Sequence, residues 1–191
     1  MPPAPSPKNS GPIKQKLLTH VAPTGVERRF AETDIIVSKT DVKGVITYAN
    51  RVFLDIVGLT ERQVIGAPHS FLRHPDMPRA VFALMWERLT AGKEIFAYVV
   101  NLAANGDHYW VHAHVTPTFG DNGAILGFHS NRRVPDRPAV EKIRPVYRKL
   151  KEIEDTNANR AEGLAQSRAH LNAILSASGV TYDQFVFSLA G

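Results

Sequence analysis

Residues 95–119 read IFAYVVNLAANGDHYWVHAHVTPTF, two β-rich runs on either side of the dipeptide Asn105-Gly106. Asn-Gly between two such runs is a strong signal for a β-hairpin, because both residues tolerate the positive φ angles of a tight turn. Successive side chains of a strand point to opposite faces of a sheet. The second run therefore presents an apolar set to the predicted core, namely Tyr109, Val111, Ala113 and Val115.

Three further β-rich runs flank this hairpin in the sequence. DIIVSKTD (34–41) and GVITYAN (44–50) meet at a turn around Asp41 to Gly44, which predicts a second hairpin. AILGFHSNRR (124–133) follows another turn signal, Asp121-Asn122-Gly123. The sequence thus predicts five strands, arranged as two before residue 50 and three after residue 95.

The segment between the two groups of strands predicts short helices. Asn50 begins a helical run that Gly58 ends, and Thr60 caps a second helix that extends to residue 65. Asp76 is predicted to cap a longer helix over 77–91. Two strands, several short helices and three strands indicate an α+β fold, with a five-stranded antiparallel sheet and helices on one face.

The two ends of the chain differ in composition from this central part. Residues 1–12 contain five prolines, so residues 1–30 are interpreted as a flexible N-terminal arm or cap. Residues 31–134 form the predicted domain. Residues 135–191 carry apolar side chains at helical spacing, interrupted at 155–160, and predict a C-terminal helical extension that ends in a short helix over 181–189.

Charge and cysteine content narrow the classes of function. The net charge is +4 in residues 1–30, 0 in 31–134 and +1 in 135–191, so no basic face is predicted on the domain and no nucleic-acid partner is expected. The chain has no cysteine, which removes disulfides, thiolate metal sites and thiol photochemistry. No apolar run reaches the ~20 residues that cross a bilayer. These features predict a cytoplasmic protein without membrane insertion.

Polar residues with binding chemistry cluster in one loop. His69, Arg73, His74 and Asp76 lie within eight positions, and Trp86 follows ten residues later. One interpretation is a loop whose polar side chains pair with each other. The other is a polar rim around a ligand, in which arginine binds phosphate, histidine donates to a ring carbonyl and tryptophan stacks on an aromatic ring.

The same stretch carries a resemblance to a known family. PHSFLRHPDMPRAVFALMWERL (68–89), NGDHYWVHAHVTP (105–117) and TDVKGVITYAN (40–50) resemble the PAS domain of the bacterial aerotaxis receptor family, over about residues 24–150. This resemblance implies a PAS fold, non-covalently bound FAD and a response to cellular redox state. The positions that match the family's cofactor-determining residues are His69, Arg73, His74, Asp76, Trp86 and Asn101. One departure is Ile95, where the family often has a second tryptophan.

A wider similarity to light-sensing flavin PAS domains adds two candidates. The run from Asn101 to Trp110 matches the first asparagine of their flavin site and its spacing to a tryptophan, whereas Val111 replaces the second asparagine. The glutamine of these domains falls on His129, which is therefore expected near the redox edge of a flavin. Asn50 completes the set of candidate cofactor-binding residues.

The remaining histidines of the second hairpin strand do not indicate a metal site. His112 and His114 share one face with His108 and Trp110, but no third ligand follows at a metal-site spacing. That face is instead expected to be covered by the terminal helices or by a second subunit.

The sequence lacks the common enzyme motifs, including glycine-rich phosphate loops, Gly-x-Ser-x-Gly and His-Glu-x-x-His. The predicted function is a signalling sensor that is not an enzyme, forms a homodimer and acts through an unidentified downstream signalling protein. Two alternatives remain open. One is a sensor that binds haem b through His69, His74 or His129, and the other is a cofactor-free interaction or dimerisation module.

Overall fold

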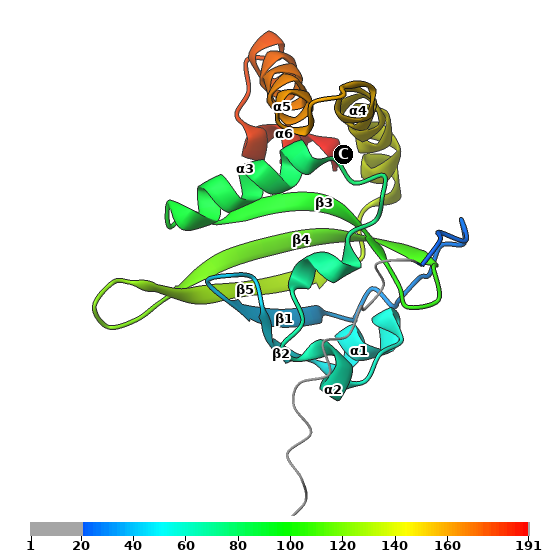
Figure 1. Ribbon diagram of the computed structural model, residues 1–191, viewed down its shortest axis with the longest axis vertical. Coiled ribbons are helices and arrows are strands. Elements are labelled where there is room, and N and C mark those ends of the chain that lie inside the picture. The colour runs from blue at the N-terminus through cyan, green and yellow to red at the C-terminus, as the bar shows by residue number, and fades with distance from the viewer. Residues whose placement is uncertain (1–20, 191) are drawn as a thin grey trace, which may run out of the picture.

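The computed structural model describes residues 21–190, so most of the predicted N-terminal arm lies outside the described residues. One five-stranded antiparallel sheet has the order β2-β1-β5-β4-β3 (Figure 1). Its strands are β1 (Ile36–Asp41), β2 (Ile46–Ala49), β3 (Ile95–Leu102), β4 (His108–Phe119) and β5 (Ile125–Arg133). The predicted strands and both hairpins are confirmed, with Asn101 opposite Tyr109 in the β3–β4 pair.

Short helices connect β2 to β3 and lie on one face of the sheet. They are α1 (Arg51–Val57), α2 (Glu61–Val64), the 3-10 helix η1 (His69–Leu72) and α3 (Arg79–Thr90). The Asn50 side chain caps α1 by accepting a hydrogen bond from the Phe53 N–H at 3.0 Å. Gly58 ends α1 in the left-handed conformation, φ 75°. The α+β prediction is thus confirmed.

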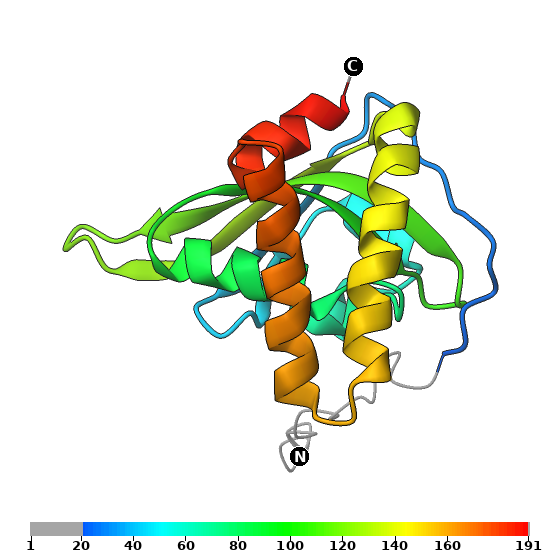
Figure 2. The same ribbon diagram turned by 90° about the horizontal axis from the view of Figure 1, so that it is seen from above.

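The C-terminal extension forms three helices: α4 (Arg137–Thr156), α5 (Arg160–Ala177) and α6 (Tyr182–Leu189). Figure 2 shows α4 and α5 side by side as an antiparallel hairpin. Gly163 permits this close approach, because a Cβ there would lie 3.0 Å from the Glu154 carbonyl oxygen. The buried Ser167 hydroxyl also donates to the Leu150 carbonyl at 3.1 Å. The predicted polar interruption at 155–160 is the turn of this hairpin.

Helices α4 and α6 cover the face of β3 and β4 that points away from α1–α3. Tyr147 of α4 donates a hydrogen bond to the Tyr98 carbonyl at 2.7 Å and stacks near Trp110. Phe187 of α6 packs against Phe96, with ring centroids 4.8 Å apart. The expected cover over this face is therefore supplied by the C-terminal helices. None of the helices in residues 21–190 has the length and apolarity to cross a membrane.

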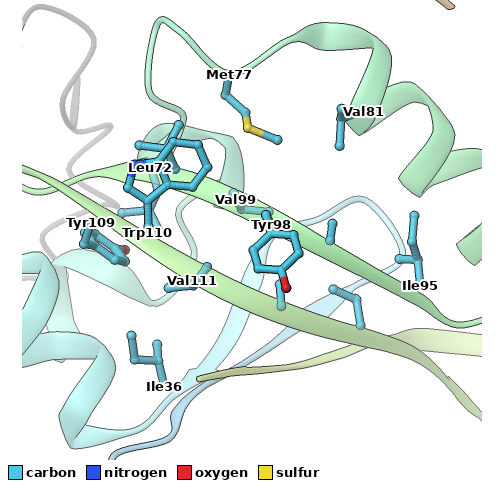
Figure 3. Close-up of a cluster of buried hydrophobic side chains, with 14 of the residues drawn as sticks. Ile36, Leu72, Met77, Val81, Ile95, Tyr98, Val99, Tyr109, Trp110 and Val111 are labelled. Carbon is cyan, nitrogen blue, oxygen red and sulfur yellow. The ribbon is translucent and has the colours of Figure 1, made fainter. Parts of the chain in front are cut away.

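Buried apolar side chains surround β3 and β4. In Figure 3, Ile36 and Val111 lie below β3 and β4, whereas Met77 and Val81 lie above them. All four are less than 2% exposed. The same cluster of buried residues includes Ile143 and Leu150 of α4, so the core continues from the central domain into the C-terminal helices.

Residues 21–30, the described end of the predicted N-terminal arm or cap, lie against the domain. The Thr24 N–H donates to the Gly106 carbonyl at 2.8 Å, and the Arg28 N–H donates to the His108 carbonyl at 2.7 Å. The Arg28 guanidinium also pairs with Asp107 at 3.2 Å and donates to the Ile56 carbonyl at 2.8 Å. Carbonyl groups of the β3–β4 turn thus hold this segment in place. The composition of the segment alone does not predict these long-range hydrogen bonds.

The predicted N-cap of α3 is wrong, since α3 begins after Pro78 and Asp76 does not cap it. Glu154 of α4 takes that role. Its carboxylate accepts hydrogen bonds from the N–H groups of Arg79 and Ala80, both at 2.9 Å, and from the Arg79 guanidinium at 3.0 Å. Glu154 is only 3% exposed. A distant helix thus satisfies the free N–H groups and the positive end of the α3 dipole.

Replacing Glu154 should therefore destabilise the whole fold. We expect Glu154→Ala to lower the free energy of unfolding by about 3 kcal/mol, because it leaves the Arg79 guanidinium and two backbone N–H groups without their acceptor. Urea unfolding followed by circular dichroism measures this loss. The matched control is Glu152→Ala on the exposed side of the same helix. Equal losses in the two variants would contradict the capping role of Glu154.

Candidate functional site

A cavity of about 330 Å³ lies between the sheet and the helices α3 and η1. Val99, Ala113, Val115 and Phe128 line it from the sheet, and Phe82, Met85 and Leu89 line it from α3. Its volume falls at the lower end of the ~300–1,000 Å³ that is typical of small-molecule sites. Apolar walls with a few polar groups are the usual composition of such sites.

Trp86 of α3 lies at an open part of this cavity. Its side chain is 39% exposed and contacts Phe128 edge to face, with ring centroids 5.4 Å apart. The ring rests on Gly44 in the β1–β2 turn, where a Cβ would lie only 3.1 Å from it. Gly44 has φ +79°, so both the turn and the indole require glycine there. The neighbouring Lys43 is exposed and also lines the cavity.

Arg73 and Asn101 meet at the edge of the sheet. Their backbones form an isolated antiparallel bridge, which ties the end of η1 to β3. The Arg73 guanidinium lies over the Phe82 ring at 3.9 Å, and its Nε is buried without a partner among the described residues. Burial, followed by the charge of Arg160, lowers the pKa of Arg73. The side chain of Arg73 is therefore positioned by stacking and retains hydrogen-bonding capacity.

A second arginine lies deeper in the cavity. Arg132 of β5 is 4% exposed, and its Nη2 donates to the Ser38 hydroxyl at 2.9 Å and to Nε2 of His69 at 2.6 Å. Its Nη1 has no partner among the described residues, and neither has the hydroxyl of Ser130, two positions earlier on the same strand. Buried polar atoms normally have hydrogen-bond partners. These atoms therefore retain hydrogen-bonding capacity that a polar ligand in the cavity could use.

Electrostatics fix the protonation states at this end of the cavity. Burial, together with the charge of Arg132, lowers the pKa of His69 to about 3. His69 is thus neutral at physiological pH and accepts the hydrogen bond from Arg132. Burial also lowers the pKa of Arg132, to about 10, so its guanidinium stays charged. No acidic side chain lines this cavity in residues 21–190, so its three charged groups, Lys43, Arg73 and Arg132, are all positive.

The structure brings together four of the predicted site residues: His69, Arg73, Trp86 and Asn101 line the cavity. The other four predicted residues do not line it. Asn50 uses its side chain to hold β1 to α1, accepting from the Val37 N–H at 3.0 Å and donating to the Ile35 carbonyl at 2.7 Å. His74 and Asp76 line a separate groove against α4, and the Asp76 side chain is 84% exposed.

The expected position of His129 is wrong. Its neighbours Phe128 and Ser130 line the cavity, and alternation along β5 therefore turns His129 to the opposite face. There its Nε2 contacts Oδ1 of Asn131 at 3.0 Å. Anchoring the alternation on the apolar Phe128 would have assigned Ser130 and Arg132 to the cavity. The sequence resemblance placed the strand one residue out of register, which moves every side chain to the other face.

The other histidines of β4 have structural surroundings. His114 stacks on Phe96 with centroids 4.1 Å apart and contacts Glu94 at 2.7 Å, whereas His112 stacks on Tyr98. Within residues 21–190, no group of three or more histidine, aspartate or glutamate side chains could hold a metal ion.

The buried neutral state of His69 predicts acid sensitivity. Its pKa is about 3 in the folded chain and near 6.5 in the unfolded chain, so it contributes stability above pH 6.5 that is lost as the pH falls toward 3. At most, one such group changes the free energy of unfolding by about 1.4 kcal/mol per pH unit. His69→Gln keeps an acceptor for Arg132 and should flatten the profile between pH 6 and pH 4, as measured by urea unfolding of cofactor-free protein. Parallel profiles for the variant and the wild type would contradict this assignment.

Comparisons with known proteins agree with this architecture. Residues 46–131 match the family model described as PAS fold. The aerotaxis receptor of Escherichia coli K12 is 38% identical over 121 residues, which cover 63% of this chain and 24% of the receptor. A blue-light-activated histidine kinase of Rhizobium johnstonii is 26% identical over 60% of this chain and 34% of the kinase. The chain thus spans about a quarter to a third of the length of these relatives.

A solved light-oxygen-voltage domain, studied with a flavin analogue, superposes with a TM-score of 0.51. The match has 17% sequence identity and covers 64% of this chain and 87% of that domain, so it establishes a shared fold. The match to the receptor confirms the resemblance seen in the sequence. The family model and the solved structure confirm the predicted fold. Residues 46–131 of this chain therefore match the PAS fold, and the chain is related in sequence to the aerotaxis receptor of Escherichia coli.

Proposed function

We propose that this chain is a signalling sensor that binds FAD non-covalently in the cavity and responds to redox state. The observation that carries this proposal is the set of buried, unpartnered polar atoms in a cavity whose walls are largely apolar: Arg73 Nε, Arg132 Nη1 and Ser130 Oγ. Leaving such atoms unpaired costs about 1–3 kcal/mol each. A planar, apolar ring with polar edges would satisfy Arg132 Nη1 and Ser130 Oγ and fill the space between the apolar walls, and a phosphate would satisfy Arg73.

The lining residues fit the parts of such a cofactor. The amide of Asn101 and the hydroxyl of Ser130 suit the carbonyl and nitrogen edge of the flavin ring, and the apolar walls suit its faces. Arg73 and Lys43 suit its phosphates, because guanidinium and ammonium groups bind phosphate oxygens. The exposed edge of Trp86 offers an aromatic surface for stacking. When bound, a flavin supplies one- and two-electron redox chemistry.

The positions of the histidines favour flavin over haem. Of the three candidate haem ligands, only His69 lines the cavity, and its Nε2 already accepts a hydrogen bond from Arg132. A haem iron at that nitrogen would have to displace the guanidinium. The size of the cavity and its unpaired polar atoms also favour a ligand-binding domain over a cofactor-free module.

Two structural connections support signal output through the C-terminal helices. Arg73 leads within six residues to Arg79, whose guanidinium and N–H bind the buried Glu154 of α4. Arg132 lies at the end of β5, four residues before the N-cap of the same helix at Asp136. A change in the cavity can therefore reach α4 from both ends. The proposal assigns the output to a partner protein and no enzymatic activity to this chain. The homodimer and the cytoplasmic location stay predictions from sequence.

The first experiment is an absorbance spectrum of protein purified from cells, before and after dithionite. Two flavin bands that bleach on reduction are expected, and chromatography of the heat-released cofactor should identify FAD. A Soret band would replace flavin with haem. Colourless protein that stays colourless after incubation with FAD would overturn the proposal and leave a cofactor-free PAS module.

Substitutions on the two faces of the sheet test the location of the site. We expect Asn101→Ala and Arg73→Ala to reduce the flavin-to-protein ratio at least tenfold, because each removes a polar group that the cavity directs at the ligand. His129→Ala, on the opposite face, is the matched control and should retain the wild-type ratio. Fluorescence titration with added FAD measures the affinity of each variant. Loss of flavin from the His129 variant alone would place the site on the other face.

A further inference from the structure

We propose that Arg132 sets the reduction potential of the bound flavin by favouring a reduced form that carries negative charge. This inference rests on the proposed function and concerns the direction in which the cavity biases the cofactor. It assigns a role to a residue that lies outside the positions carried by the family resemblance.

The surroundings of Arg132 make its charge available. Its two protein partners, the Ser38 hydroxyl and the His69 ring nitrogen, are both neutral acceptors. None of the ion pairs within residues 21–190 involves Arg132, and its Nη1 is buried with no hydrogen bond. The guanidinium carbon lies 5.8 Å from the centroid of the Phe53 ring, which carries no net charge. A buried charge is normally paired, because taking an ion out of water is costly. The uncompensated positive charge of Arg132 therefore favours negative charge on whatever occupies the cavity.

The other cations of the cavity are placed differently. Lys43 is exposed to solvent, which screens its charge. Arg73 stacks on Phe82, and the nearby Glu154 carboxylate offsets part of its charge. Arg132 is thus the cation of the described cavity whose field is least screened. Interactions between charges are stronger in a buried, low-dielectric site than at the surface.

Arg132 and His69 place a positive charge beside the ligand, but neither group readily donates a proton to it. His69 is held neutral with Nε2 as an acceptor, and Arg132 stays protonated because its pKa is about 10. Two electrons from an external reductant, such as dithionite, and one proton from water give a reduced ring with one negative charge. A second proton would neutralise that ring. The field of Arg132 opposes this second protonation and makes reduction easier.

The proton count can be measured without any variant. For a two-electron couple, a tenfold change in equilibrium constant corresponds to about 30 mV. Uptake of one proton therefore shifts the midpoint potential by about 30 mV per pH unit, and uptake of two protons shifts it by about 59 mV. Spectroelectrochemical titration of the wild-type protein between pH 6 and pH 8 should give the smaller slope. The larger slope would overturn the inference.

Three variants then test the residue. In Arg132→Gln the equilibrium constant for reduction should fall at least tenfold, so the midpoint potential should fall by at least about 30 mV. The pH slope of the midpoint potential should rise toward the value for two protons. Arg132→Lys restores the charge and should lie closer to the wild type. Arg133→Gln is the matched control: it removes the same charge from the next, exposed residue of β5 and should leave the potential unchanged.

The outcomes separate this inference from the proposed function. Flavin-loaded Arg132→Gln with a wild-type potential and slope would overturn the role of Arg132 and leave the flavin site intact. Wild-type protein that binds no flavin would overturn both. If Arg132→Gln fails to fold, a two-proton slope in the wild-type protein still overturns the inference.

Discussion

The strict alternation of side chains along β3, β4 and β5 governs both the cavity and its cover. Val99, Asn101 and Ala113 point to one side with Ser130 and Arg132, whereas their neighbours Tyr98 and Trp110 point to the other and pack against α4. Each strand residue that lines the cavity therefore has sequence neighbours whose side chains point to the opposite face of the sheet. A register shift of one position would exchange the two sets and destroy both layers.

The two layers meet at Glu154. This carboxylate, from the helix that covers the outer face, binds the first N–H groups of the helix that lines the cavity. Because it is buried and paired with Arg79, the contact persists only while both helices keep their positions. The proposed sensor function needs a connection of this kind, which must be strong enough to hold one arrangement and specific enough to transmit a displacement. The loop that supplies Arg73 to the cavity ends at this contact.

The sequence predicted the strands, the turns and most of the helix boundaries, because local signals such as Asn105-Gly106, Gly58 and Thr60 fix them. It also predicted His69, Arg73, Trp86 and Asn101 for the site, through resemblance. Glu154 could not be predicted as the cap of α3, since the two lie 75 positions apart and only the tertiary fold brings them together. Arg132 was missed for a different reason. Alternation from the apolar Phe128 places Ser130 and Arg132 on the cavity face, whereas the resemblance placed His129 there, one residue out of register.

The unpartnered polar groups in the cavity lower the stability of the ligand-free fold, and their presence therefore suggests a function in binding. A domain that only needed stability would fill this space with apolar side chains, since a buried arginine without a carboxylate partner and a buried hydroxyl without a hydrogen bond lower the stability of the empty fold. Such groups persist at functional sites, where a ligand recovers part of the cost and gains affinity from it. The same reasoning links binding to sensing. A fixed charge that is uncompensated before the ligand enters is the charge most able to distinguish two redox states of that ligand after it is bound.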